Sequence, residues 1–241
     1  MNTLHNFAFN VYPYLCLAVF FMGSLARFDR DQYTWKSDSS QLLRKAQLRW
    51  GSNLFHGGIL FLFFGHLFGQ LTPHGLYEIF VTASQKQLIA VVAGGIAGGL
   101  CFIGLTLLLH RRLFDPRIRL TSHRTDIAIL VILWVQLVIG LSTLPASLHH
   151  VSDPQTMLRL AEYLQGIVLM QPNAALVAGV EWHFQAHMLL GMTIFLLFPF
   201  SRLVHVWSGF GTLAYLVRPY QMVRARRLNV SASQNPARRV G

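Results

Sequence analysis

Five long apolar segments alternate with polar, charge-bearing segments along the chain. They cover approximately residues 4–26, 50–71, 88–109, 127–146 and 183–206. About 20 predominantly apolar residues are enough for a helix to cross the hydrocarbon core of a bilayer. The pattern therefore predicts an all-α integral membrane protein, a bundle of five transmembrane helices.

The basic residues predict how this bundle is oriented. All but two of the 20 lysines and arginines fall in residues 27–49, residues 110–124 and the segment from Arg202 onward; the other two are Lys86 and Arg159. Because cytoplasmic loops of membrane proteins carry the excess of Lys and Arg, these three segments are expected inside. The N-terminus is then outside (periplasmic) and the C-terminus cytoplasmic.

Composition supports a membrane protein and narrows its class. Only 12% of residues are charged, about half the roughly 25% of a soluble domain. The net charge of +11 is explained by basic residues at cytoplasmic helix ends, and we expect no nucleic-acid partner. No Lys or Arg precedes the first apolar segment, so that segment is not a typical cleaved signal and is expected to be retained. Cys16 and Cys101 lie in apolar segments without a CxxC motif, which argues against thiol-ligated zinc, iron–sulfur clusters and covalent c-type haem.

Four of the 11 histidines are predicted to lie within the membrane, where ionisable groups are costly and usually functional. His56 and His66 are in the second span, and His187 and His205 are in the fifth. These two spans run in opposite directions. His56 and His205 are therefore both expected toward the cytoplasm, and His66 and His187 both toward the exterior.

This arrangement predicts two His–His pairs at two depths. Along straight helices, the separation is ~27 Å in the fifth span and ~15 Å in the second, a disagreement of ~12 Å. A haem ligated from both faces tolerates this mismatch better than a single metal ion does. Two bis-histidine b-type haems, which carry electrons and do not bind O₂, are the favoured interpretation. The alternative is that these are core histidines hydrogen-bonded to the backbone.

Other residues bear on the same interpretation. Glycines near the ligands would allow close approach of a porphyrin: Gly57, Gly58, Gly65, Gly69 and Gly191. Arg111, Arg112 and Arg202 could pair with propionates of the cytoplasmic haem or could be ordinary snorkelling arginines. Gly94, Gly95, Gly98 and Gly99 form a small-residue face that predicts close helix packing.

The remaining segments are less informative. The connection 148–181 is the longest outside the membrane, and Pro154–Leu169 is expected to form an amphipathic helix, either a lid or simply packed there. Its apolar side would carry Met157, Leu160, Ala161, Leu164 and Val168. Residues 1–228 are taken as one membrane domain, and the composition of 229–241 predicts a disordered cytoplasmic tail.

Several stretches resemble the gamma (cytochrome b) subunit of the respiratory membrane-bound nitrate reductase. They are SNLFHGGILFLFFGHLFGQLTPH, RRLFDPR, HMLLGMTIFLLFPFSRLVHVWS and RPYQMVRAR, with YPY and QYTW near the first span. The resemblance covers about residues 10–227 and includes all four intramembrane histidines. The 148–181 connection and the tail match poorly, so no role is carried over there.

The resemblance implies a function. The subunit of this family lies in the bacterial inner membrane, oxidises quinol at the outer side, and passes electrons from a distal to a proximal haem. They continue to an iron–sulfur (beta) subunit and a molybdenum (alpha) subunit that reduces nitrate, which contributes to the proton-motive force. His66 and His187 match the distal ligands, and His56 and His205 the proximal ones. Lys86 matches a lysine of the quinol site, although it could instead be an interfacial anchor.

Two alternatives stay open at this stage. The chain could be a di-haem cytochrome b of another quinone-linked enzyme, such as a formate dehydrogenase or hydrogenase. It could also be a haem-free anchor or a proton-relay transporter. A relay would usually include intramembrane carboxylates, and none of the nine acidic residues is predicted to lie mid-span.

Overall fold

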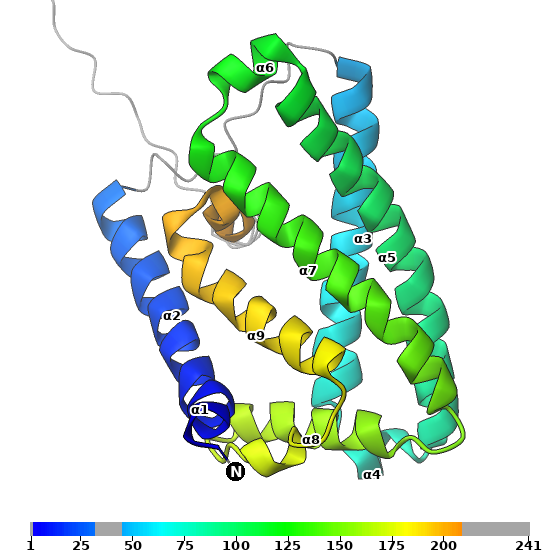
Figure 1. The fold of residues 1–241 in the computed structure, drawn as a ribbon. Helices are drawn as coiled ribbons and strands as arrows, with labels where there is room; N and C mark the ends of the chain where they lie inside the picture. Colours follow the sequence, from blue (N-terminus) through cyan, green and yellow to red (C-terminus); the bar gives the residue numbers. More distant parts are fainter. Residues whose placement is uncertain (1, 32–44, 209–241) are drawn as a thin grey trace, which may run out of the picture.

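The computed structural model describes residues 2–31 and 45–208, and these residues form helices without strands (Figure 1). The long helices are α2 (Tyr12–Asp31), α3 (Lys45–Leu71), α5 (Ala83–Phe114), α7 (Arg124–His149) and α9 (Trp182–Leu197). The shorter ones are α1 (Thr3–Asn6), α4 (His74–Tyr77), α6 (Pro116–Thr121) and α8 (Gln155–Val168), with a π-helix, η1 (Phe7–Val11), between α1 and α2. Three 3₁₀ segments, η3 (Ala174–Leu176), η4 (Phe198–Phe200) and η5 (Arg202–Val204), complete the described elements.

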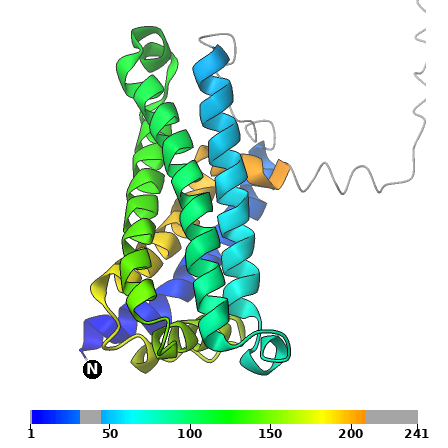
Figure 2. The same cartoon turned by 90° about the vertical axis from the view of Figure 1, so that its right-hand side faces the viewer.

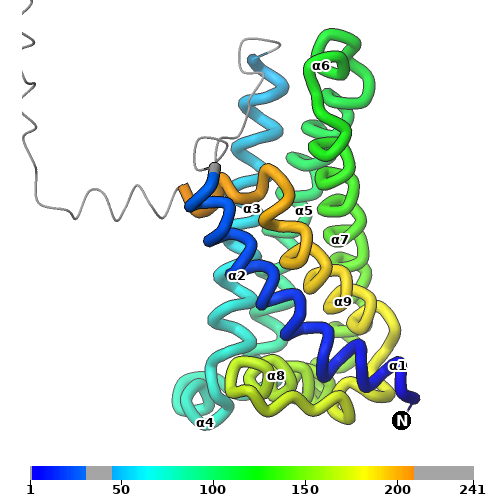
Figure 3. The backbone as a smooth tube through the Cα atoms, turned by 90° about the vertical axis from the view of Figure 1, so that its left-hand side faces the viewer, coloured from blue at the N-terminus to red at the C-terminus, as the bar shows by residue number. Residues whose placement is uncertain are grey.

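Five helical segments of this part of the chain are long and apolar enough to cross a membrane, which confirms the predicted fold class. They are Thr3–Arg30, Lys45–Leu71, Ala83–Phe114, Arg124–His149 and Trp182–Phe200. Helices α3 and α5 run side by side (Figure 2), and α2 and α9 form a second, more inclined pair (Figure 3). Helix α7 contacts both α5 and α9, so it joins the two pairs. The predicted tail, 229–241, lies outside the described residues.

Glycines allow α3 and α5 to pack with their backbones nearly in contact. A Cβ on Gly104 would collide with the backbone nitrogen of Phe55 and would lie 2.8 Å from the carbonyl oxygen of Gly51. A Cβ on Gly58 would lie 2.7 Å from the carbonyl oxygen of Ala97. Such contacts admit only the smallest residue, because backbone cannot move aside as a side chain can. Gly58 therefore serves helix packing, contrary to its predicted role beside a porphyrin.

The small-residue face predicted in the third span is only partly used for packing. A Cβ on Gly98 would lie 2.7 Å from a methyl of Leu141 on α7, and one on Gly95 would lie 3.6 Å from a methyl of Leu144. At Gly94 and Gly99 an added Cβ would meet nothing within 4 Å. The prediction of close approach thus holds for two of the four glycines.

The fifth span is broken, whereas the sequence predicted one straight helix over 183–206. Helix α9 ends at Leu197, and η4 contains Pro199, which lacks the backbone N–H needed to continue the helix. Ser201 is extended (φ −118°, ψ 177°), its hydroxyl accepts from the Leu203 nitrogen, and η5 follows. The ~27 Å separation along one straight helix therefore does not apply.

Helix α8 lies across one end of the bundle (Figures 1 and 3). The hydroxyl of Tyr163 donates to the backbone carbonyl oxygen of Phe9 at 2.6 Å. The side-chain amide of Gln165 donates to the backbone carbonyl oxygen of Gln70 at 2.9 Å. These bonds tie α8 to the N-terminal segment and to the end of α3. The predicted amphipathic helix is present, but Val168 is 63% exposed, and Tyr163 and Ile167 join the buried side in its place.

Candidate functional site

The four histidines that the sequence predicts within the membrane meet in two facing pairs. The ring centres of His56 and His205 are 6.3 Å apart, with the rings at 74°. Those of His66 and His187 are 6.2 Å apart, with the rings at 38°. The break after α9 brings His205 to α3, so both pairs have nearly the same separation.

This separation suits one metal atom between two imidazoles. An imidazole nitrogen binds a metal at about 2 Å, and the ring centre lies about 1.1 Å behind it, so ligands on opposite sides of one iron have centres about 6.2 Å apart. A direct hydrogen bond between the rings would bring the centres to about 5 Å. The rings are therefore too far apart to bond each other and suitably spaced to share an iron.

In each of the four rings, Nδ1 donates to a backbone carbonyl oxygen. The acceptors are Ser52 for His56 (2.8 Å), Leu62 for His66 (2.7 Å), Gln136 for His187 (3.2 Å) and Arg202 for His205 (2.7 Å). Metal-ligating histidines almost always hold their second ring nitrogen in this way, which fixes the tautomer and leaves Nε2 with its lone pair. Ordinary core histidines also bond to backbone, so the facing of the rings is the more specific feature.

His187 depends on α7 for its position. A Cβ on Gly140 would lie 2.7 Å from Cε1 of the His187 ring, so only glycine leaves room for the ring there. Gln136 lies one turn before Gly140, and its backbone carbonyl oxygen accepts a hydrogen bond from His187 Nδ1. The side-chain amide of Gln136 donates to the His187 carbonyl oxygen at 3.0 Å and lies 3.5 Å from His187 Nε2. Gly191, predicted to face a porphyrin, instead faces the Gln136 amide, which is 3.2 Å from an added Cβ.

A cavity of about 440 Å³ adjoins the His66–His187 pair, called the outer pair below because the sequence predicts it toward the exterior. His66 and His187 both line it, with Lys86 and His150 on its polar side and Met157 and Leu160 of α8 among its apolar residues. Gly65 and Gly69 of α3 also line it, and an added Cβ would meet nothing within 4 Å at either position or at Gly57. This volume is within the usual range for ligand sites, about 300–1,000 Å³.

Within residues 2–31 and 45–208, no group of three or more His, Cys, Asp or Glu side chains could hold a metal ion. Zinc sites need three or four protein ligands. Each histidine pair therefore presents the two-ligand set that an iron porphyrin, which supplies four nitrogens of its own, would complete.

Arginines and one carboxylate form a cluster at the other end of the bundle, near His205. Asp126 Oδ2 is 3.4 Å from an Nη of Arg112 and 3.3 Å from one of Arg202, and all three side chains are largely buried. Arg111 is 2% exposed. The arginines predicted as propionate partners thus gather at one place, where two of them share Asp126, a partner that the sequence analysis did not identify.

Lys86 stands over the ring of Tyr77, with its Nζ 3.6 Å from the ring centre. Among the described residues its ammonium makes no salt bridge, although it lines the outer cavity. A cation held on an aromatic face keeps its N–H groups for another acceptor. Tyr77 could not be identified from the sequence pattern, because this contact joins α4 to α5 across a turn.

His150, which the sequence placed beyond a span end, forms a further pair. Its Nε2 donates to Oε1 of Glu181 at 2.8 Å, and both side chains are 38% exposed. A bond from its own backbone N–H and the bond from His150 hold the pKa of the Glu181 carboxyl below its usual value. Glu181 is the residue before α9, so this contact joins the ends of two spans.

The fold and the site together define the class: a five-helix membrane protein with two pairs of facing imidazoles. The model of the family described as nitrate reductase gamma subunit matches residues 5–226. The chain therefore belongs to the nitrate reductase gamma subunit family.

Relatives in this family can be aligned with this chain over nearly their whole length. The chain is 48% identical over 227 residues to respiratory nitrate reductase 1 gamma chain of Escherichia coli (94% of this chain, 100% of the relative). It is 50% identical over 225 residues to respiratory nitrate reductase 2 gamma chain of the same organism (93% and 98%). It is 37% identical over 218 residues to nitrate reductase gamma chain of Bacillus subtilis (90% and 96%). It is thus a membrane subunit of a respiratory nitrate reductase, an oxidoreductase complex of several subunits.

Proposed function

We propose that the chain is the quinol-oxidising subunit of this complex and holds two b-type haems. His66 and His187 would ligate the outer (distal) haem, and His56 and His205 the inner (proximal) one. The observation that carries this proposal is that both pairs have ring centres 6.2–6.3 Å apart while every Nδ1 is bonded to backbone. When bound, each haem supplies a one-electron carrier with both axial positions filled, so it does not bind O₂.

The outer cavity is the proposed quinol site, because it combines apolar walls with few polar groups beside the outer pair. Lys86 would donate a hydrogen bond to a quinol oxygen and stabilise negative charge as a proton leaves. His66 Nδ1 already donates to Leu62. A quinol oxygen could reach that nitrogen only by sharing or displacing the Leu62 carbonyl, which favours Lys86 as the main polar contact.

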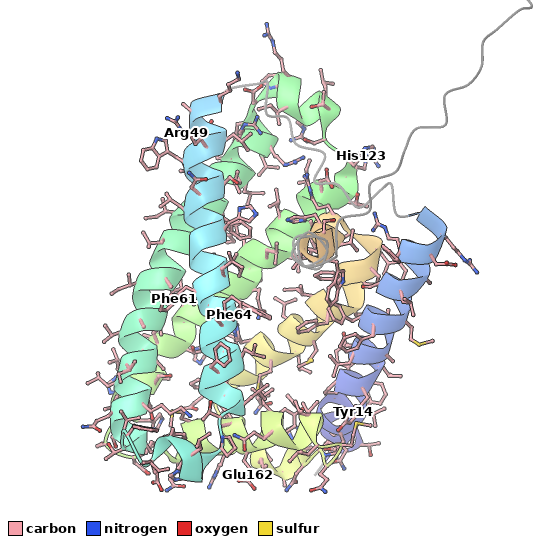
Figure 4. The ribbon with its side chains drawn as sticks, turned by 180° about the vertical axis from the view of Figure 1, so that it is seen from behind. Tyr14, Arg49, Phe61, Phe64, His123 and Glu162 are labelled. Atoms are coloured by element: carbon pink, nitrogen blue, oxygen red, sulfur yellow. The ribbon has the colours of Figure 1, made fainter. Side chains whose placement is uncertain are left out.

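The charge distribution supports the proposed orientation in the inner membrane. Arg49 and Glu162 lie at opposite ends of the bundle (Figure 4), and α8 with Lys86 is at the same end as Glu162. By the positive-inside rule the arginine-rich end faces the cytoplasm, so the quinol site faces outward. An iron–sulfur subunit would then receive electrons at the arginine-rich end and pass them to the molybdenum subunit.

Sealed vesicles with a known orientation test this function. The whole complex is supplied with decylubiquinol and nitrate, and external pH is recorded in weak buffer. We expect nitrate-dependent quinol oxidation that acidifies the compartment facing α8. The proposal would be contradicted if the complex reduced nitrate only with donors other than quinol. Protons released on the arginine-rich side would also contradict it.

A further inference from the structure

The outer cavity needs a proton acceptor as well as a hydrogen-bond donor, because oxidation of a quinol to a quinone releases two protons and two electrons. While it is charged, Lys86 can donate hydrogen bonds but cannot accept a proton. His66 and His187 bond backbone through Nδ1 and would hold iron through Nε2. These three groups therefore leave the proton without an acceptor.

His150 is the remaining titratable side chain among the described residues that line this cavity. The others are apolar residues, glycines, amides and hydroxyls, none of which accepts a proton near neutral pH. Gln87, which follows Lys86 and also lines the cavity, donates from its side-chain amide to the Ser147 carbonyl oxygen at 2.7 Å.

The contact with Glu181 prepares His150 for this task. A carboxylate only accepts hydrogen bonds, so Nε2 carries the hydrogen and Nδ1 of the neutral ring keeps its lone pair. No group of the part of the chain that the structure describes bonds that Nδ1. The negative charge of Glu181 also stabilises the imidazolium that forms on protonation, as in other histidine–carboxylate pairs.

We propose that His150 accepts the protons that quinol releases in the outer cavity and that Glu181 is its positioning residue; this rests on the quinol oxidation proposed above. In each half of the reaction a quinol O–H bond breaks and an Nδ1–H bond forms on His150. The electron released in each half would go to the haem that His66 and His187 would hold. The imidazolium then loses its proton to external water, which the 38% exposure of the pair permits.

The test uses the whole complex in membranes with decylubiquinol as donor. His150→Gln is compared with His149→Gln, since His149 is the neighbouring histidine, is exposed and does not line the cavity. We expect His150→Gln to lower kcat by about tenfold or more with little change in KM, because general-base groups typically contribute 10²–10⁴-fold. His149→Gln should leave kcat unchanged. Added imidazole should restore part of the rate to His150→Ala.

Glu181→Gln provides a second and milder variant. Its control is Glu78→Gln, because Glu78 also faces a histidine, His74, at 3.3 Å but does not line the cavity. We expect a several-fold lower kcat for Glu181→Gln, recovery in Glu181→Asp, and no change for Glu78→Gln. Haem content, the outer haem potential and nitrate reduction by a reduced viologen should be unaltered in all of these variants.

The outcomes separate the two proposals. A wild-type complex that binds two haems yet does not oxidise quinol would overturn the proposed function. Normal quinol oxidation in the wild type with wild-type kcat in His150→Gln would overturn the role of His150 alone. If His150→Gln loses a haem, the test passes to Glu181→Gln. A wild-type kcat in Glu181→Gln would then overturn the roles proposed for His150 and Glu181.

Discussion

The inner and outer histidine pairs share one ring spacing but have different surroundings. The ring centres are 6.3 Å apart in the inner pair and 6.2 Å in the outer pair. The inner pair lies near the Arg112–Asp126–Arg202 cluster, while the outer pair adjoins an apolar cavity that α8 helps to line. On the proposed function, the difference teaches that ring spacing would select the cofactor, whereas the neighbouring residues would decide whether a site meets a lipid-soluble donor or a charged partner subunit.

The pairs also differ in how their rings are held. His56, His66 and His205 each donate to a carbonyl three or four residues earlier in their own segment. His187 instead donates to Gln136 on α7 and lies against Gly140. The outer site therefore depends on the packing of α7 against α9, and the inner site on the break after α9.

Removing a ligand should have the largest effect and separate the two pairs. His66→Ala or His187→Ala should remove one haem. Electrons from quinol then could not enter the chain of cofactors, so quinol-dependent nitrate reduction should fall at least a hundredfold, as expected for an essential group. Nitrate reduction by reduced viologen on the cytoplasmic side should survive. Equal loss of both activities would mean failed assembly and would remove the evidence for separate roles.

Gly140→Ala should come next and should affect only the outer pair. The new methyl would lie 2.7 Å from the His187 ring, so that ring must turn and its haem should be lost or change its absorption and potential. Gly99→Ala is the matched control, because its Cβ meets nothing within 4 Å. Optical redox titration measures both; an outer haem unchanged in Gly140→Ala would show that the contact is not tight.

Lys86→Ala should weaken quinol oxidation while both haems stay bound. Loss of a charged hydrogen bond of about 1.5–3 kcal/mol corresponds to a roughly 10- to 160-fold lower kcat/KM. Arg159→Ala, on α8, is the control for loss of outer positive charge. Unchanged quinol kinetics in Lys86→Ala would remove this residue from the site.

Asp126→Asn should give the smallest effect and should mark the inner site. Removing a negative charge near His205 favours the reduced, more negative state, so the inner haem potential should rise while the outer one stays constant. Potentiometric titration of both haems tests this. A larger shift in the outer haem would place the cluster nearer the other pair.

The sequence predicted the spans well because bilayer thickness sets their length and lipid sets their composition. It also predicted which histidines would face each other, because antiparallel spans leave one arrangement by depth. The ~12 Å mismatch expected for two straight helices is absent from the structure, because Pro199 breaks the fifth span.

What the sequence could not supply are contacts between distant elements. Gly140 is one of 19 glycines, and only the packed ring of His187 shows why it is there. The bond from His150 to Glu181 spans 31 residues, and Asp126 meets Arg202 across 76. Such pairs leave no periodic pattern in the sequence. They depend on how α7 and α9 are inclined, which packing determines.

The central claim is that paired imidazoles hold two haems at two depths. Its most direct test is a redox titration with haem quantification of the assembled wild-type membrane complex. We expect two b-type haems for each copy of this chain, with different potentials and the spectra of bis-imidazole iron. One haem per chain, or iron with another axial ligand, would contradict the account.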